Sequence, residues 1–169
     1  MTSGEVFAAF VNGVHVLRLT GDVRLNLCSA FEHYLDEILE RSDFTNVVID
    51  LSDAQGVDST TLGQIAKVAI ICRERFDITP TIASPNPSIT RILLSMGFDQ
   101  VFHIVDQAFT TDVEFDRWVA GSVDQEEARE QVIAAHKVLM SMNDANANTF
   151  KALVDSLEAD RPDRYKRML

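Results

Sequence analysis

One serine of this chain stands where a modification could change a binding surface. Ser59 follows Asp58 at the start of a predicted helix. The first backbone N–H groups of a helix lack intrahelical partners and the helix dipole is positive there, so a phosphate on Ser59 would be accommodated locally. It would also add about −1.5 to −2 charges beside Asp58. Because such a group alters the surface without unfolding the chain, this position could act as a switch.

The same two residues also fit a purely structural role. Asp and Ser are among the preferred helix N-caps, whose side-chain oxygens accept hydrogen bonds from the first free N–H groups. From the residues alone, Asp58 or Ser59 could therefore cap the helix and do nothing more.

Other chemistries find little support in the sequence. The surroundings of Ser59 lack the Gly-x-Ser-x-Gly elbow of serine hydrolases, and no Gly-rich phosphate loop occurs. The histidines stand on separate predicted elements without the spacing of metal ligands; they are His15, His33, His103 and His136. We therefore expect a protein that is not an enzyme and that binds no metal or cofactor.

A buried strand and a helix are predicted on either side of the serine. Val47–Leu51 is a short β-branched run, typical of a strand buried on both faces. Ser59–Arg75 repeats apolar residues at helical spacing. Asp50 ends that strand and Asp22 ends an earlier one, so both can lie on the same sheet edge as Ser59. There they could form part of a partner surface or cap turns.

The other predicted elements complete an α/β fold. Asn12-Gly13 between two apolar runs is a strong hairpin signal. The remaining strands are predicted at residues 6–11, 14–19, 79–83 and 101–104, and the remaining helices at 25–41, at 87–96 and from Asp106 to about Trp118. The resulting order, ββαβαβαβα, predicts a mixed sheet with mainly parallel inner strands and helices packed on it.

Two further helices are predicted after a break near Ala120-Gly121-Ser122. They span Asp124–Met140 and about Ala147–Ala159, and each carries an apolar stripe. A basic stretch at residues 161–167 is expected to fray. We therefore expect a domain at residues 1–120 and a helical extension at 121–169, which either packs on the domain or binds a second partner or another copy.

Composition narrows the choice of partner and location. The 169 residues carry a net charge of −11, which repels phosphate backbones and anionic lipids, so neither nucleic acid nor membrane is an expected partner. The chain shows no signal peptide and no apolar run long enough to span a bilayer, and we expect a cytoplasmic location. Cys28 and Cys72 lie in predicted helices and are expected to be two buried thiols.

The region around Ser59 resembles the STAS domain family, which includes anti-sigma factor antagonists and relatives of sulfate transporters. In that family a strand like Val47–Leu51 leads to an Asp-Ser motif, small residues and Leu-Gly, matched here by Asp58–Gly63. Residues 86–104 resemble the third helix and last strand of the family, and Gly21-Asp22 resembles its turn after the second strand. The matches occur in the family's order and cover about residues 4–118.

This resemblance implies a phosphorylation switch. In anti-sigma factor antagonists, the serine matching Ser59 is phosphorylated by a serine kinase, often the anti-sigma factor itself, and a phosphatase reverses the reaction. The unphosphorylated antagonist binds the anti-sigma factor and thereby frees the sigma factor. Carried over, Ser59 is the phosphoacceptor and Thr60 the second candidate, because Thr60-Thr61 replace the small pair common in the family. The expected partner surface comprises Asp58, Thr60, Thr61, Asp22 and Asp50.

The resemblance also allows two other outputs in a bacterial cell. The C-terminal helices suggest an adaptor that steers a signalling enzyme, such as a diguanylate cyclase, because a minimal antagonist does not need them. Alternatively, the chain could be a STAS accessory subunit of a transport ATPase, in which Ser59 need not be modified.

Overall fold

A computed structural model describes residues 3–24, 28–41, 43–119 and 123–162 of the chain, without the side chains of Cys28 and Leu39. Over these ranges, no helix is both long and apolar enough to cross a membrane. The predicted boundary near residues 120–122 lies outside the described residues, as does most of the basic tail.

Within the described ranges the strands form one mixed sheet in the order β6-β5-β3-β2-β1-β7, and β4 pairs with the end of β2. The pairing is parallel among β2, β3, β5 and β6 and antiparallel on both sides of β1. The strands are β1 (Glu5–Val11), β2 (Val14–Val23), β3 (Asn46–Asp50), β4 (Ala54–Val57), β5 (Thr81–Ala83), β6 (His103–Val105) and β7 (Asp116–Trp118).

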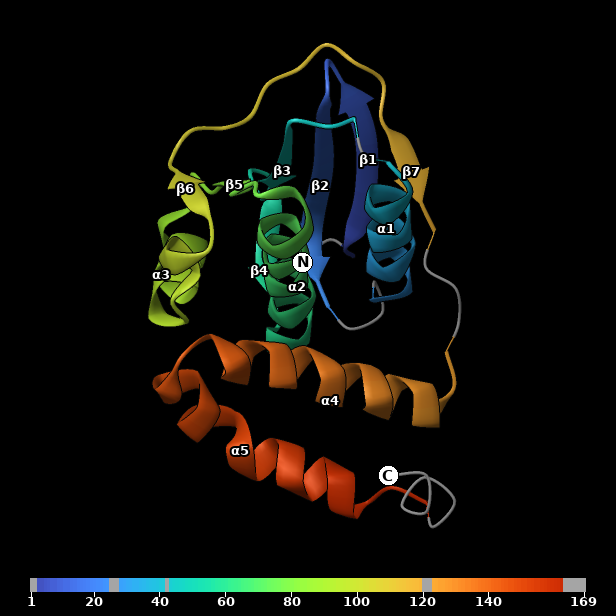
Figure 1. Ribbon diagram of the computed structural model, residues 1–169, viewed down its shortest axis with the longest axis vertical. Coiled ribbons are helices and arrows are strands. Elements are labelled where there is room, and N and C mark those ends of the chain that lie inside the picture. The colour runs from blue at the N-terminus through green and yellow to red at the C-terminus, as the bar shows by residue number, and fades with distance from the viewer. Residues whose placement is uncertain (1–2, 25–27, 42, 120–122, 163–169) are drawn as a thin grey trace.

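Three helices pack on one face of the sheet (Figure 1). They are α1 (Cys28–Glu40), α2 (Ser59–Phe76) and α3 (Pro87–Ser95), with a short 3-10 helix η2 (Phe98–Gln100) after α3. Each connects parallel strands that advance in one direction along the sheet, and right-handed crossovers place such helices on the same face. The core lies between these helices and the sheet and includes Leu17, Phe31, Ile49, Leu62 and Ile65.

Two more helices lie across one end of this layer (Figure 1). They are α4 (Gln125–Met142) and α5 (Asp144–Ala159), joined at Asn143. The predicted C-terminal helices are therefore present, and the second begins earlier than expected because the Asn143 side chain caps it. The hairpin at Asn12-Gly13 is also confirmed, with φ values of 49° and 81° that suit a tight turn.

The predicted helix from Asp106 to Trp118 is wrong. Residues 106–115 form neither helix nor strand and lead into β7, which pairs with the edge of β1 (Figure 1). Trp118 explains part of this outcome, because its ring lies edge-on to the rings of Tyr34 and His33, each 6.1 Å away. The strand at the sheet edge brings the Trp118 side chain onto α1. This long-range contact could not be predicted from the helical propensity of the segment.

The end of β2 also differs from the prediction. The strand continues through Gly21-Asp22 to Val23 instead of ending there, and its register with β4 shifts between Gly21 and Asp22. Because β4 is short and contains Gly56, its sequence gave no strand signal. The extra pairing places the segment that precedes α2 beside the end of β2.

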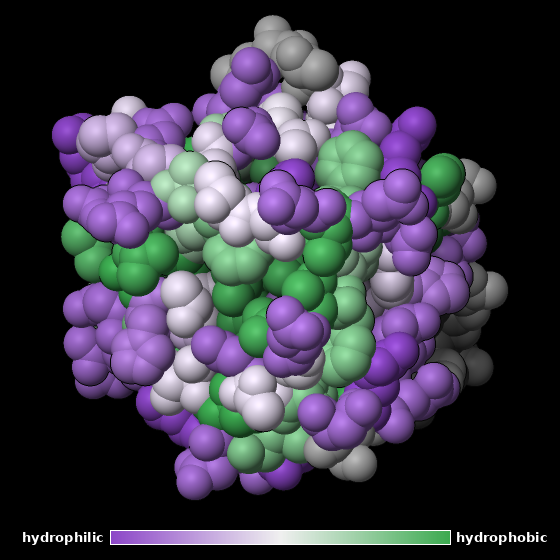
Figure 2. Space-filling model, turned by 90° about the horizontal axis from the view of Figure 1, so that it is seen from above, coloured by the Kyte–Doolittle hydropathy of each residue, from purple (hydrophilic) through white to green (hydrophobic). Residues whose placement is uncertain are grey.

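The end of the molecule opposite α4 and α5 has a different surface. Hydrophobic side chains gather at its centre within a hydrophilic rim (Figure 2). Ser59 is remote from this end, because it begins α2 at the end that α4 crosses (Figure 1).

Candidate functional site

The start of α2 is fixed by its own cap and by β2. Asp58 is the N-cap, and its Oδ1 accepts a hydrogen bond of 2.8 Å from the Thr61 N–H. The Asp58 N–H donates to the Val23 carbonyl at 3.1 Å. Ser59 is therefore the first helical residue, held at a defined place beside the end of the sheet, while Asp58 performs the capping.

The Ser59 hydroxyl contacts a histidine of the C-terminal helices. Ser59 Oγ lies 2.8 Å from His136 Nε2, and His136 Nδ1 lies 2.7 Å from the Val132 carbonyl oxygen. A carbonyl oxygen only accepts, so Nδ1 carries a proton, and in that tautomer of the neutral ring Nε2 accepts from the serine hydroxyl. The His136 side chain is 1% exposed and packs edge-on against Phe150, with ring centroids 5.0 Å apart. A buried histidine on α4 thus holds the hydroxyl of Ser59.

One turn further along α2, the two helices come into close contact. A Cβ on Gly63 would lie 2.7 Å from Ala135 Cβ and closer still to the Ala135 carbonyl oxygen. Real Cβ atoms do not approach other atoms so closely, so α4 can take this position only because residue 63 is glycine. The Leu-Gly pair of the motif therefore has a structural use here.

The turn between α4 and α5 is attached to the domain at a second place. Asn143 Nδ2 and Asn146 Nδ2 both donate to the Met96 carbonyl oxygen just after α3, at 3.2 and 2.9 Å. Asn146, which is buried, also donates to the Leu139 carbonyl oxygen at 2.9 Å. The helical pair is consequently anchored at the start of α2 and at the end of α3.

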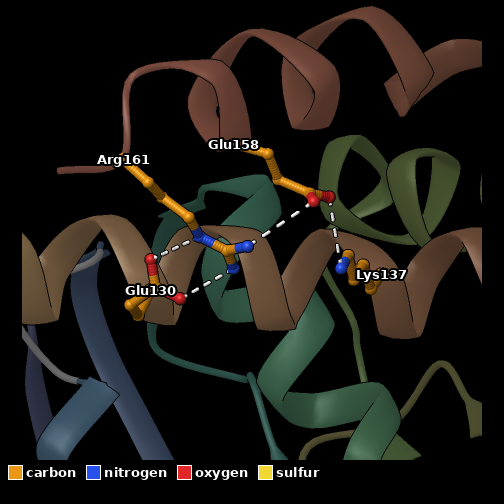
Figure 3. Close-up of polar contacts among 4 residues, drawn as sticks. All are labelled: Glu130, Lys137, Glu158 and Arg161. Carbon is orange, nitrogen blue, oxygen red and sulfur yellow. Dashed lines mark hydrogen bonds and ion pairs between the residues drawn. The ribbon is translucent and has the colours of Figure 1, made fainter. Parts of the chain in front are cut away.

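Ion pairs hold α5 on α4 (Figure 3). Arg161 donates two hydrogen bonds to the Glu130 carboxylate, at 2.9 and 2.7 Å, and a longer contact of 3.5 Å joins it to Glu158. Lys137 reaches the other oxygen of Glu158 at 3.2 Å. Arg161 was expected in a frayed tail, but its side chain is only 7% exposed; residues 163–169 lie outside the described part. We call α4, α5 and Arg161 together the C-terminal hairpin.

Several residues predicted for the partner surface are not accessible in this structure. Thr60 and Thr61 are buried within α2, at 6% and 1% exposure. Asp50 is 1% exposed. Its Oδ2 accepts from Arg18 Nε at 2.9 Å, and its Oδ1 accepts from the Ser52 N–H at 3.0 Å. A buried carboxylate needs such partners, so Asp50 stabilises the end of β3 instead of facing a partner.

Asp22 does lie close to the serine segment. Its Oδ2 accepts a hydrogen bond of 2.6 Å from Arg24 Nε, and a Cβ on Gly56 would be 3.0 Å from its Oδ1. The hydrogen bond from Arg24 to Asp22, with further attraction from Asp22 and Asp58, raises the pKa of Arg24. The structure thus brings Asp22, Asp58 and Ser59 together and keeps Asp50 apart.

The remaining histidines do not join this site. His15 is buried among aromatic rings, and no group of three or more metal-ligating side chains occurs in the described ranges. The role of His136 was missed by sequence reasoning, which considered a function for it only as a metal ligand, although it lies within the apolar stripe of residues 124–140. A polar ring inside that stripe was the available signal, because a buried imidazole needs a hydrogen-bond partner.

A serine hydrogen-bonded to a histidine is also the geometry of a nucleophile with its general base. Here, however, the pair lies between two helices that touch one turn away, at Gly63 and Ala135. A substrate would have to enter where α4 already lies. We therefore interpret the pair as a contact that holds α4 on the start of α2.

Comparison with known families finds a match that covers most of the sheet and the helices packed on it. A family model described as STAS domain matches residues 7–112, which is more than half of the chain. No curated protein matches the chain significantly. The matched region contains Ser59 and ends before α4, so His136 and the C-terminal hairpin lie outside it.

Proposed function

The chain belongs to the STAS domain family, and from this membership and the geometry of Ser59 we propose that it is an anti-sigma factor antagonist controlled by phosphorylation of Ser59. The observation that carries the proposal is that Asp58 alone caps α2. The Ser59 hydroxyl is therefore not needed to start the helix, so its modification would leave the cap in place. Such a protein would work in the cytoplasm of a bacterium.

The chemistry of the switch follows from charge. A serine kinase transfers the γ-phosphoryl group of ATP to Ser59 Oγ, which loses its proton, and a phosphatase hydrolyses the ester. The phosphate brings about −1.5 to −2 charges next to Asp58 and Asp22. A partner that had buried this surface would then face an unpaired anion, which is costly to desolvate, and the complex would dissociate. Thr60 is the second candidate acceptor, although it is buried.

A pull-down from lysate of the source cells tests this proposal. The baits are the wild-type chain, Ser59→Ala and the chain with phosphoserine introduced at position 59 during synthesis. We expect the first two to capture an anti-sigma factor with a serine kinase domain and the phosphoserine bait to lose it. Ser95→Ala is the matched control, because Ser95 is an exposed serine on α3, and it should behave like wild type.

Phosphopeptide mapping of the chain purified from its own cells gives a second readout. A phosphate on Ser59 agrees with the proposal, and a phosphate on Thr60 moves the acceptor by one residue. If the phosphoserine bait keeps every partner of the wild-type bait, the switch is refuted.

The C-terminal hairpin favours a second candidate, an adaptor that regulates a signalling enzyme such as a diguanylate cyclase. The hairpin contacts Ser59 through His136, yet it lies outside the family match. Capture of a cyclase by the same baits would support this reading. Capture of a transport ATPase by all of them would instead support an accessory subunit of a transporter.

A further inference from the structure

Helix α4 crosses the start of α2 (Figure 1), where it contacts Ser59 and where a kinase or a partner would have to bind. We infer that the C-terminal hairpin is a detachable cover: it closes over the unphosphorylated serine, and phosphorylation of Ser59 releases it. The inference rests on the proposed function only in taking Ser59 as the phosphoacceptor. It assigns to α4 and α5 the regulation of access to that serine.

The closed contact depends on a free hydroxyl. Ser59 Oγ and His136 Nε2 lie 2.8 Å apart, and His136 Nδ1 faces the Val132 carbonyl; in the tautomer with the proton on Nδ1, Nε2 accepts from the Ser59 hydroxyl. A phosphate ester has no hydrogen on Oγ, so the donor is lost. The distance also leaves no room for a phosphorus atom and three oxygens between Oγ and the imidazole. The phosphorylated serine therefore cannot keep His136 in place.

Charge acts in the same direction. The phosphate would add its negative charge beside the Asp58 carboxylate. Of the cations on the hairpin, Lys137 is held by Glu158 and Arg161 by Glu130 (Figure 3). Those pairs keep these two side chains engaged between α4 and α5, so the phosphate gains no compensation from them.

The two helices of the hairpin are tied to each other, so they can move together. Its two helices are joined by the ion pairs of Arg161 and Lys137 and by the packing of His136 on Phe150. Its polar attachments to the domain include the Ser59 contact and the bonds of Asn143 and Asn146 to one carbonyl. Losing the first attachment therefore shifts the open–closed equilibrium while α4 and α5 stay paired.

Docking of α4, binding of a kinase and binding of a partner therefore compete for one surface at the start of α2. A kinase can reach Ser59 only when α4 is off, and a partner that binds the start of α2 must displace α4. Phosphate then keeps the cover open after the kinase has left. Whatever opens the hairpin exposes Ser59 to a kinase, and phosphorylation in turn weakens hairpin docking.

Hydrogen–deuterium exchange of the full chain tests the cover without knowledge of the kinase. We compare the unmodified chain with the chain carrying phosphoserine at position 59. We expect amides of α4 and of the first turns of α2 to exchange at least about tenfold faster in the phosphorylated chain, with β2 and β3 unchanged. Equal or slower exchange in α4 would overturn the inference, since it would mean that α4 stays docked on the phosphorylated serine.

A substitution at the helix contact tests the cover independently of charge. Gly63→Ala places a Cβ against Ala135 and should raise α4 exchange, while the added methyl favours α2 itself because alanine is the better helix former. His136→Ala should have the same effect by removing the acceptor. Lys151→Ala is the matched control, because Lys151 is exposed on α5 and pairs only along that helix with Asp155, and it should leave α4 exchange unchanged. Unchanged exchange in both test variants would contradict the cover.

The outcomes separate this inference from the proposed function. If phosphoserine at position 59 speeds exchange in α4 but no anti-sigma factor is captured, the inference of a detachable cover is supported and the proposed antagonist function is wrong. If partner capture depends on the phosphate while amide exchange in α4 does not, the proposed antagonist function is supported and the inference of a detachable cover is wrong.

Discussion

At the residue scale, Asp58 and Ser59 divide two tasks that either side chain could perform. Asp58 caps α2 through the Thr61 N–H, which leaves the hydroxyl of Ser59 to bond with His136. The sequence predicted a helix start with a modifiable serine but could not assign the cap. Nor could it predict the histidine, because the contact joins positions 77 residues apart.

Burial of an imidazole makes the stability of the chain depend on pH. His15 is 4% exposed, with the rings of Phe10 and Phe44 centred 4.7 and 5.1 Å away. Burial, and secondarily the charge of Arg41, lowers the pKa of His15 to about 4. Between the unfolded value of about 6.5 and this value, the unfolded chain binds a proton that the folded chain does not. The contribution of neutral His15 to the free energy of unfolding is therefore fully present above about pH 6.5 and decreases as the pH falls towards 4. Below about pH 4, protonation of His15 causes no further loss of stability.

We expect the free energy of unfolding to fall by about 2 kcal/mol between pH 7.5 and pH 5 on account of His15. Urea denaturation at both pH values measures this difference. A His15→Leu variant should lose this part of the pH dependence, whereas His33→Ala, at an exposed histidine, should keep it. An equal pH dependence in wild type and His15→Leu would contradict the assignment.

At the element scale, tertiary contacts decided the segments that local sequence could not. The helices with strong caps and stripes, α2 and α3, begin where predicted, at Ser59 and Pro87. The segment 106–118 had a possible cap at Asp106 but became a loop and β7, because the edge of β1 was available for pairing. Strand β4 likewise exists through its partner β2 and not through its own composition.

The pairing of α5 with α4 depends on one buried arginine. Arg161→Ala should remove both hydrogen bonds to Glu130 and leave that carboxylate without its closest cation. We expect a Tm lower by roughly 2 to 6 °C and faster amide exchange in α5. Differential scanning calorimetry and hydrogen exchange measure the two effects. Lys151→Ala removes an exposed pair on the same helix and should leave Tm unchanged; equal effects of the two variants would show that the Arg161 pair adds nothing.

At the scale of the whole molecule, the order of elements was sufficient to predict the α/β class, while the place of the last two helices was not predictable. Their apolar stripes indicate only that each helix packs against something. The glycine at position 63 and the asparagines at 143 and 146 fix where they dock, and these residues act across long sequence separations. The same docking decides whether the surface at Ser59 is open.

Removing the C-terminal hairpin tests whether residues 1–119 form an independent domain. The core between α1, α2, α3 and the sheet lies almost wholly within these residues, although Leu139 and Phe150 also belong to it. We expect a chain ending at Val119 to fold with a native-like circular dichroism spectrum. It should be less stable by roughly 2 to 4 kcal/mol in urea, because the apolar surface of α2 beneath α4 becomes exposed.

The matched control for this deletion is a chain ending at Pro162, which keeps Arg161 and its ion pairs and should equal the full chain in stability. The chain ending at Val119 should also expose Ser59. Once the kinase is identified and purified, it should phosphorylate this shorter chain faster than the full chain. If the chain ending at Val119 does not fold, α4 and α5 are an integral layer of one domain. A cover that must open for phosphorylation would then have to open only at the start of α2, where His136 meets Ser59.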